Sequence, residues 1–177
     1  MKFIRVFSYL IILLISFGSY SNMLDFLKPY SYILSPDVSG VVTKTGEVYQ
    51  GLKITLDVEY GDSYFTFDSV TDEFGRFSFD EVILHRWTKP FKLNNNVVAI
   101  RIFTNFNGVE KQLWGSYIGK LSPMQFIVDN LNDLECDIDS DKYQFEFENE
   151  KKDAIPYSVY GICNLKGYIE KFNKDNK

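Results

Sequence analysis

Hydrophobic and polar residues alternate along several short stretches of this chain, with the period of two that is typical of half-buried β-strands. The clearest stretch is LKITLDVEY, residues 52–60, whose apolar positions all fall on one face and whose polar positions fall on the other. Gly61-Asp62 follows as a turn signal, so residues 63–71 are predicted to return as the second strand of a hairpin. The pattern predicts a second hairpin within residues 96–118, with Asn107-Gly108 as a type I′ turn.

The rest of the chain continues the all-β pattern. Strands are predicted at residues 143–148 and 158–165, and only residues 122–132 favour a helical turn or two. Several short strands separated by turn signals indicate an all-β sandwich formed by a single domain. The predicted boundaries are a lead-in segment at 22–35, the sandwich at 36–169 and a disordered tail at 170–177.

Composition agrees with one globular domain and argues against one class of partner. The chain has 177 residues, of which 45% are hydrophobic and 17% aromatic, and aromatic residues favour pleated, half-buried surfaces. It carries 19 Lys and Arg against 24 Asp and Glu, a formal net charge of −5. Nucleic-acid binding needs clustered cations to displace counterions, so we expect no nucleic-acid partner.

The N-terminus has the pattern of a secretory signal peptide at residues 1–21. Lys2 and Arg5 precede an apolar stretch at residues 6–17, and small residues lead up to an expected cleavage before Asn22. The apolar stretch is shorter than the roughly 20 residues that a membrane-spanning helix needs, so the mature protein is expected to have no transmembrane domain. No cysteine lies near the cleavage site for a lipid anchor. The predicted location is the periplasm or the exterior, with an uncleaved N-terminal membrane anchor as the alternative.

Export changes the interpretation of the two cysteines, Cys136 and Cys163. They are the only cysteines in the chain, and an even count in an oxidising compartment favours a disulfide. Their spacing does not fit the Cys-x-x-Cys pattern of redox catalysts. The alternative is a pair of buried free thiols.

A resemblance to a known family rests mainly on DVSGVVTKTGEVYQGLKITL and TDEFGRFSF, within residues 37–82. These segments are similar to the transthyretin-like, or carboxypeptidase-regulatory-like, sandwich. The matching positions are Gly40 and Val42 in a first strand, then Gly51, Ile54 and Leu56, and finally Thr71, Asp72, Gly75, Phe77 and Phe79 in a turn and strand. In physical terms TDEFGRFSF is expected to be a corner of the fold, in which Asp72 accepts hydrogen bonds and Gly75 relieves strain.

The resemblance implies an accessory or binding module without peptidase activity. Downstream, LECDID and YGICNL resemble a small group of exported bacterial proteins of unassigned role that carry the same two cysteines. Some bacterial proteins with this kind of sandwich are periplasmic immunity proteins against type VI lipase effectors. That last step is an analogy of fold, and a fold does not determine a function.

The residues contain no recognisable catalytic set. His85 is the only histidine, and neither a nucleophile elbow nor a zinc-ligand cluster nor a phosphate-binding loop accompanies it. The acidic stretch 137–148 imitates a calcium loop, yet Lys142 stands where the sharp turn needs glycine, so a solvated acidic turn is favoured. We therefore expect no enzyme, no cofactor and no metal, and His85 is expected to be an ordinary loop residue.

Binding is the remaining function, and residues 79–96 are its expected location. This stretch lacks clean periodicity and is predicted to be a loop, and its Arg86, Trp87 and Lys89 form the candidate interface. The alternative is that Trp87 packs at the edge of the core. Trp114, which lies among strand residues, is expected to be a core residue. We predict an exported, non-enzymatic protein-binding domain, with a periplasmic immunity protein that neutralises a toxin such as a type VI lipase effector as its sharpest form. A structural or assembly module of the bacterial envelope and a small-ligand or carbohydrate-binding module are the alternatives, and the oligomeric state stays open.

Overall fold

The computed structural model describes residues 29–89, 97–118 and 120–173 and divides the chain into two compact units. Of these residues, 29–30 and 85–89 belong to the smaller unit, and 31–84, 97–118 and 120–173 belong to the larger one. The larger unit contains most of the predicted sandwich. The predicted signal peptide lies outside the described residues.

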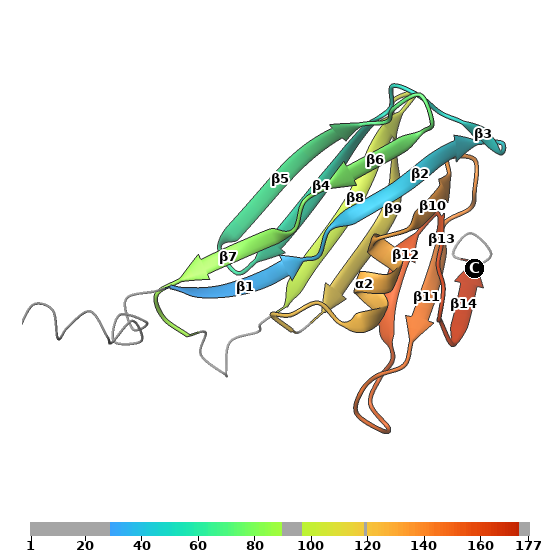
Figure 1. Ribbon diagram of the computed structural model, residues 1–177. Coiled ribbons are helices and arrows are strands. Elements are labelled where there is room, and N and C mark those ends of the chain that lie inside the picture. The colour runs from blue at the N-terminus through green and yellow to red at the C-terminus, as the bar shows by residue number, and fades with distance from the viewer. Residues whose placement is uncertain (1–28, 90–96, 119, 174–177) are drawn as a thin grey trace, which may run out of the picture. The chain divides into compact units, whose positions relative to one another are not determined.

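An antiparallel sheet of seven strands, in the order β14-β11-β12-β9-β8-β4-β5, forms one layer of the larger unit (Figure 1). Its strands are β4 (Lys53–Tyr60), β5 (Ser63–Val70), β8 (Val98–Phe106), β9 (Val109–Ile118), β11 (Tyr143–Phe147), β12 (Tyr157–Gly161) and β14 (Glu170–Asn173). Both predicted hairpins are confirmed, as β4–β5 and β8–β9. Asn107 (φ 53°) and Gly108 (φ 80°) both have positive φ, as the predicted type I′ turn requires.

A second sheet has the order β13-β10-β2-β3, with β6 also paired to β2. Its strands are β2 (Val38–Lys44), β3 (Glu47–Val48), β6 (Arg76–Phe79), β10 (Leu134–Asp137) and β13 (Cys163–Asn164). The β10–β2 pair is parallel and the other pairs are antiparallel. Helix α2 (Gln125–Leu131) confirms the predicted helical turns, and β1 (Tyr30–Ser35) pairs with β7 (Val82–Arg86) in a separate two-stranded sheet.

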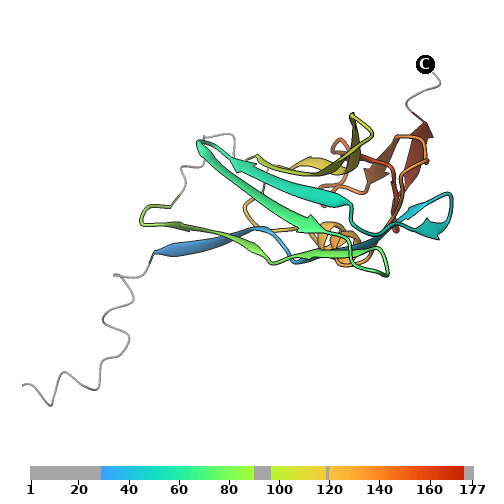
Figure 2. The ribbon, with the colours of Figure 1, turned by 90° about the horizontal axis from the view of Figure 1, so that it is seen from above.

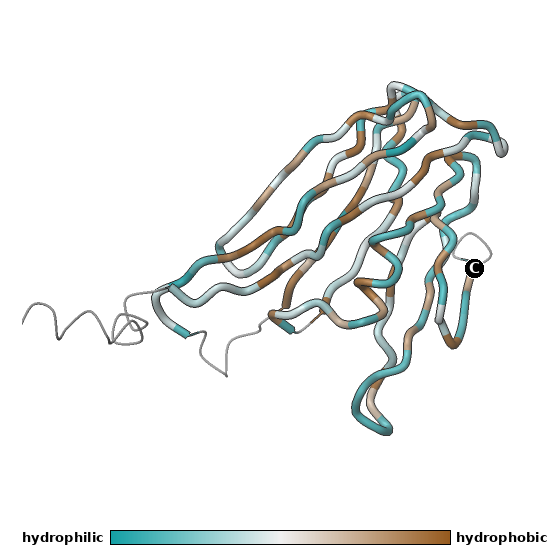
Figure 3. The backbone as a smooth tube through the Cα atoms, viewed as in Figure 1, coloured by the Kyte–Doolittle hydropathy of each residue, from teal (hydrophilic) through white to brown (hydrophobic). Residues whose placement is uncertain are grey.

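The two larger sheets stack, and the hydrophobic core lies between them. Figure 2 shows β4 and β5 in one layer with β2 and β6 in the other. Hydrophobic and hydrophilic stretches alternate along the strands in Figure 3, because every second side chain faces the core. Trp114 is fully buried, and its indole Nε1–H donates to the hydroxyl of Ser116 at 3.1 Å, so its predicted core role is confirmed.

The corner TDEFGRFSF has a structural role. The Asp72 carboxylate accepts hydrogen bonds from the backbone N–H groups of Phe74 (2.9 Å) and Arg76 (2.8 Å), as predicted. Gly75 has φ +71°, and an added Cβ there would lie 2.6 Å from the carbonyl oxygen of Val42. The turn therefore needs glycine for its conformation and for space.

The strand after this corner supplies the anchors of the second sheet. Phe77 and Phe79 are both buried, on the same face of β6, as the alternation predicts. Opposite Phe77 in the sheet stands Gly40 of β2, where an added Cβ would lie 2.7 Å from the Cβ of Leu134. The absence of a side chain at Gly40 lets β10 and β6 pack on the two sides of β2.

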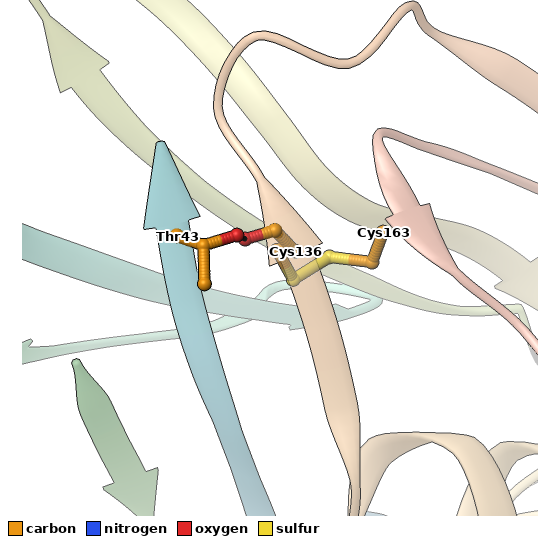
Figure 4. Close-up of a disulfide and its surroundings, with 3 residues drawn as sticks. All are labelled: Thr43, Cys136 and Cys163. Atoms are coloured by element: carbon orange, nitrogen blue, oxygen red, sulfur yellow. Dashed lines mark hydrogen bonds between the residues drawn. A yellow bond between two sulfur atoms is a disulfide. The ribbon is translucent and has the colours of Figure 1, made fainter. Parts of the chain in front are cut away.

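The predicted disulfide joins Cys136 of β10 to Cys163 of β13, which stand directly opposite each other in the sheet. Both residues are buried. The Thr43 hydroxyl donates to the carbonyl oxygen of Cys136 at 3.4 Å, so β2 contacts the same position (Figure 4). The disulfide thus fixes the short strand β13 to a sheet that β2 and β10 already form.

Two predicted boundaries differ from the structure inside the sandwich. Within 79–96, predicted as a loop, residues 82–86 form β7, so His85 is an exposed strand residue and not a loop residue. Residues 90–96 lie outside the described residues. The single strand predicted at 158–165 is divided between β12 and β13, which belong to different sheets. The division falls at Ile162, whose N–H donates to the carbonyl of Gln112 at 3.1 Å.

Strands also form in the two segments that flank the predicted sandwich. The predicted lead-in at 22–35 contains strand β1 from Tyr30 onward. The predicted disordered tail at 170–177 begins with β14, which pairs with β11 from Glu146–Glu170 to Tyr143–Asn173. Neither segment shows clean alternation, so their backbone pairing could not be inferred from the pattern of side chains.

Candidate functional site

The predicted interface residues Arg86, Trp87 and Lys89 all belong to the smaller unit. Trp87 follows directly after β7 and is 69% exposed. The Lys89 ammonium lies 5.2 Å from the centroid of the Tyr30 ring, within the range of a cation–π contact. The structure therefore brings Lys89 to an aromatic ring and leaves the indole of Trp87 accessible. That Arg86, Trp87 and Lys89 form an interface stays a prediction.

In the larger unit, an open groove of about 610 Å³ runs along the disulfide. Asp137 and Lys171 are among its lining residues, but both charges are already engaged. The Lys171 ammonium lies 3.8 Å from the centroid of the Tyr143 ring, and Asp137 anchors the turn between β2 and β3. The lining also contains Glu135, Ser140 and Asn164, polar residues that are available to contact a ligand.

Asp137 also explains the acidic stretch that imitates a calcium loop. Its carboxylate accepts hydrogen bonds from the backbone N–H groups of Gly46 (2.8 Å), Asp139 (2.9 Å) and Thr45 (3.2 Å) and from the Thr43 hydroxyl (3.1 Å). Burial acts to raise the pKa of Asp137, but these hydrogen bonds outweigh it and lower the pKa below its usual value. The described residues contain no group of three or more His, Cys, Asp or Glu placed to hold a metal ion.

A half-buried ion pair lies on the outer face of the seven-stranded sheet, the face turned away from the core, near the edge formed by β5. Asp57 of β4 is only 6% exposed and pairs with Arg101 of the neighbouring strand β8 at 2.9 Å. The Thr66 hydroxyl donates to the other carboxylate oxygen at 2.9 Å. Burial acts to raise the pKa of Asp57, but hydrogen bonding by Tyr64, Arg101 and Thr66 outweighs it and lowers the pKa.

Beside this ion pair lies a hollow of about 200 Å³, which we call the tyrosine hollow. It is lined by Asp57, Glu59, Tyr64, Ala99, Arg101 and Tyr117. The sheet register places Tyr64, Glu59, Ala99 and Tyr117 side by side on the adjacent strands β5, β4, β8 and β9 (Figure 1). The small side chain of Ala99 leaves space between two tyrosines that are 61% and 67% exposed.

The sequence pattern identified only part of this site. The alternation in residues 52–60 places Lys53, Thr55, Asp57 and Glu59 on the polar face of one strand. It does not show which strands flank that face, and therefore could not assign Tyr64, Ala99 or Tyr117 to it. The pairing partners of a strand come from the sheet topology.

The described part of the chain contains one α-helix, α2 of seven residues, and no helix there has the length and apolar character to cross a membrane.

Two stacked sheets, one antiparallel and one mixed, with an open, partly aromatic face define the protein as an all-β, sandwich-like protein. A family model described as a domain of unknown function, DUF6795, matches residues 38–141, which is more than half of the chain, and the chain belongs to this family. No curated protein and no solved structure matches the chain significantly. The matched region contains the whole tyrosine hollow and Cys136, whereas Cys163 lies beyond it.

Proposed function

We propose that this protein is an exported, non-enzymatic domain of the transthyretin-like type that binds another protein through the outer face of its seven-stranded sheet. The observation that carries the proposal is the tyrosine hollow. Tyrosine and arginine are enriched at the energetic centres of protein interfaces, and a rigid sheet holds them in position without a large entropic cost on binding.

The ion pair beside the hollow supports the same function. Asp57 and Arg101 are held together before any partner arrives, and the Arg101 guanidinium also lies 4.3 Å from the centroid of the Phe103 ring. A polar centre that is already ordered reduces the free-energy cost of desolvation and side-chain ordering on association. The exposed Trp87 of the smaller unit is a second candidate contact.

The sharpest form of the proposal is a periplasmic immunity protein that covers a toxin delivered into the bacterial envelope, such as a type VI lipase effector. Its support is the signal-like N-terminus, the disulfide, which suits an oxidising compartment, and the family resemblance of the sequence. A structural or assembly module of the envelope would use the same face for a permanent neighbour. The groove along the disulfide favours a small-ligand role as a further candidate.

Affinity capture tests the proposal. The tagged protein, expressed from its full sequence, is used as bait on envelope and secreted fractions, and bound proteins are quantified by mass spectrometry. We expect one dominant stoichiometric partner that Tyr117→Ala weakens and that Val48→Ala, at an exposed position of strand β3, leaves unchanged. If Trp87→Ala abolishes capture while Tyr117→Ala does not, the contact lies on the smaller unit. If wild-type bait captures no partner, tight protein binding is refuted.

A further inference from the structure

We infer that the tyrosine hollow is a receptor for a basic side chain, an arginine or a lysine, that a partner protein inserts between Tyr64 and Tyr117. The inference rests on the proposed protein-binding function and specifies the chemistry of the partner. It is supported by the three charged side chains of the hollow, by its two tyrosine rings and by its size.

The charge of the hollow favours a cation. Within the described part of the chain, Glu59 forms no ion pair or side-chain hydrogen bond, and it stands between Tyr64 and Ala99 in the sheet register. Asp57, in contrast, is already neutralised by Arg101. The lining therefore holds two carboxylates against one guanidinium, and Glu59 is left to receive an incoming positive charge.

Arg101 does not act as a mobile cation that fills the site. One of its terminal nitrogens lies 2.9 Å from Asp57, and the other lies 3.4 Å from Glu110 on β9. Its guanidinium also stacks over the ring of Phe103. These three contacts commit the Arg101 guanidinium, so that Glu59 stays open to a partner.

The tyrosine rings supply the second attraction. A cation over the face of an aromatic ring is attracted by the ring quadrupole, most strongly where water is excluded. The chain uses this contact repeatedly in its own structure, at Lys171 over Tyr143 (3.8 Å) and at Arg101 over Phe103 (4.3 Å). A hollow of about 200 Å³ suits one side chain and not a folded segment.

Titration by NMR tests the inference with two matched probes. The ¹⁵N-labelled full chain, purified under oxidising conditions, is titrated with the peptide acetyl-Gly-Arg-Gly-amide and with its citrulline analogue, which is nearly isosteric but uncharged. We expect amide shifts centred on Glu59, Tyr64, Ala99 and Tyr117 with the arginine peptide. The citrulline peptide is expected to bind about five-fold more weakly or not at all, as the loss of an ion pair and a cation–π contact predicts.

Variants separate the charge of the hollow from its shape. Glu59→Gln is expected to weaken binding of the arginine peptide about three- to five-fold, the range of an exposed ion pair. Glu47→Gln, at an exposed position of strand β3, is the matched control and should change nothing. Equal binding of both peptides, or shifts centred elsewhere, would overturn the inference, as would a neutral oligosaccharide that saturates the hollow when the arginine peptide does not.

Failure of this inference and failure of the proposed function give different results. A captured partner whose binding depends on Tyr117, combined with no response to the arginine peptide, would refute the basic side chain and keep the protein-binding face. A specific response to the arginine peptide with no captured partner would keep the chemistry of the hollow and refute tight binding of a protein.

Discussion

Reduction of the Cys136–Cys163 disulfide gives the most quantitative test of how this fold is held together. The bond closes a loop whose ends are 27 residues apart. In the chain-entropy model, a cross-link across that separation constrains the unfolded chain by an amount worth about 3.5 kcal/mol at 25 °C. Because both cysteines are buried in directly paired strands, we expect most of this free energy to appear as stability.

The assay is urea unfolding of the oxidised and the reduced wild-type protein, followed by tryptophan fluorescence. We expect the free energy of unfolding to fall by about 3–4 kcal/mol on reduction. The double variant Cys136→Ala, Cys163→Ala should be at least as destabilised, because it also leaves space in the core. Hydrogen exchange should accelerate first at Cys163–Asn164, since β13 has only two residues and pairs with β10 alone. A loss below about 1 kcal/mol would refute the entropic reasoning for this loop.

Three further substitutions test individual features of the structure. Asp57→Asn is expected to lower the free energy of unfolding by about 2 kcal/mol at neutral pH, because a buried, charge-assisted hydrogen-bond network is lost. The folded pKa of Asp57 is lowered, so this difference should be complete above the ordinary value of about 3.9 and disappear as the pH falls through the folded pKa. Gly75→Ala should cost more than Gly46→Ala, because both have positive φ but only Gly75 would press a Cβ against Val42. Trp87→Ala should change stability by less than about 0.5 kcal/mol, since the indole is exposed.

Urea titrations at several pH values measure all three, and each has a result that would contradict it. A wild-type advantage over Asp57→Asn that grows on acidification would reverse the assigned direction of the pKa shift. Equal losses for the two glycine variants would show that the close approach to Val42 carries no energetic cost. A large loss for Trp87→Ala would mean that the indole is packed in solution.

Local pattern predicted the elements that depend on neighbouring residues. The alternation at 52–60 and the signals Gly61-Asp62 and Asn107-Gly108 correctly predicted two hairpins, because strand period and turn conformation are local properties. The motif TDEFGRFSF correctly predicted a corner for the same reason. Its Asp72 and Gly75 act on backbone groups only a few residues away.

Features that depend on distant contacts were predicted less well. Strands β7 and β14 are formed by pairing with β1 and β11. The sequence of neither strand shows a clean alternation of hydrophobic and polar residues. The tyrosine hollow was missed because it joins four strands whose order is a property of the whole sheet. The candidate residues Arg86, Trp87 and Lys89 were selected by residue type, which does not depend on topology. Because Trp87 is exposed, its indole is accessible to a partner.

The central claim, that the outer face of the seven-stranded sheet contacts a protein, is tested most directly by photocrosslinking in the living cell. A benzophenone amino acid is introduced at Tyr117, which is 67% exposed beside the hollow, and separately at Ile155, which is 86% exposed between β11 and β12. We predict a single strong crosslinked product from Tyr117 on irradiation and none from Ile155. A crosslink from Ile155 but not from Tyr117, or none from either position, would contradict the claim.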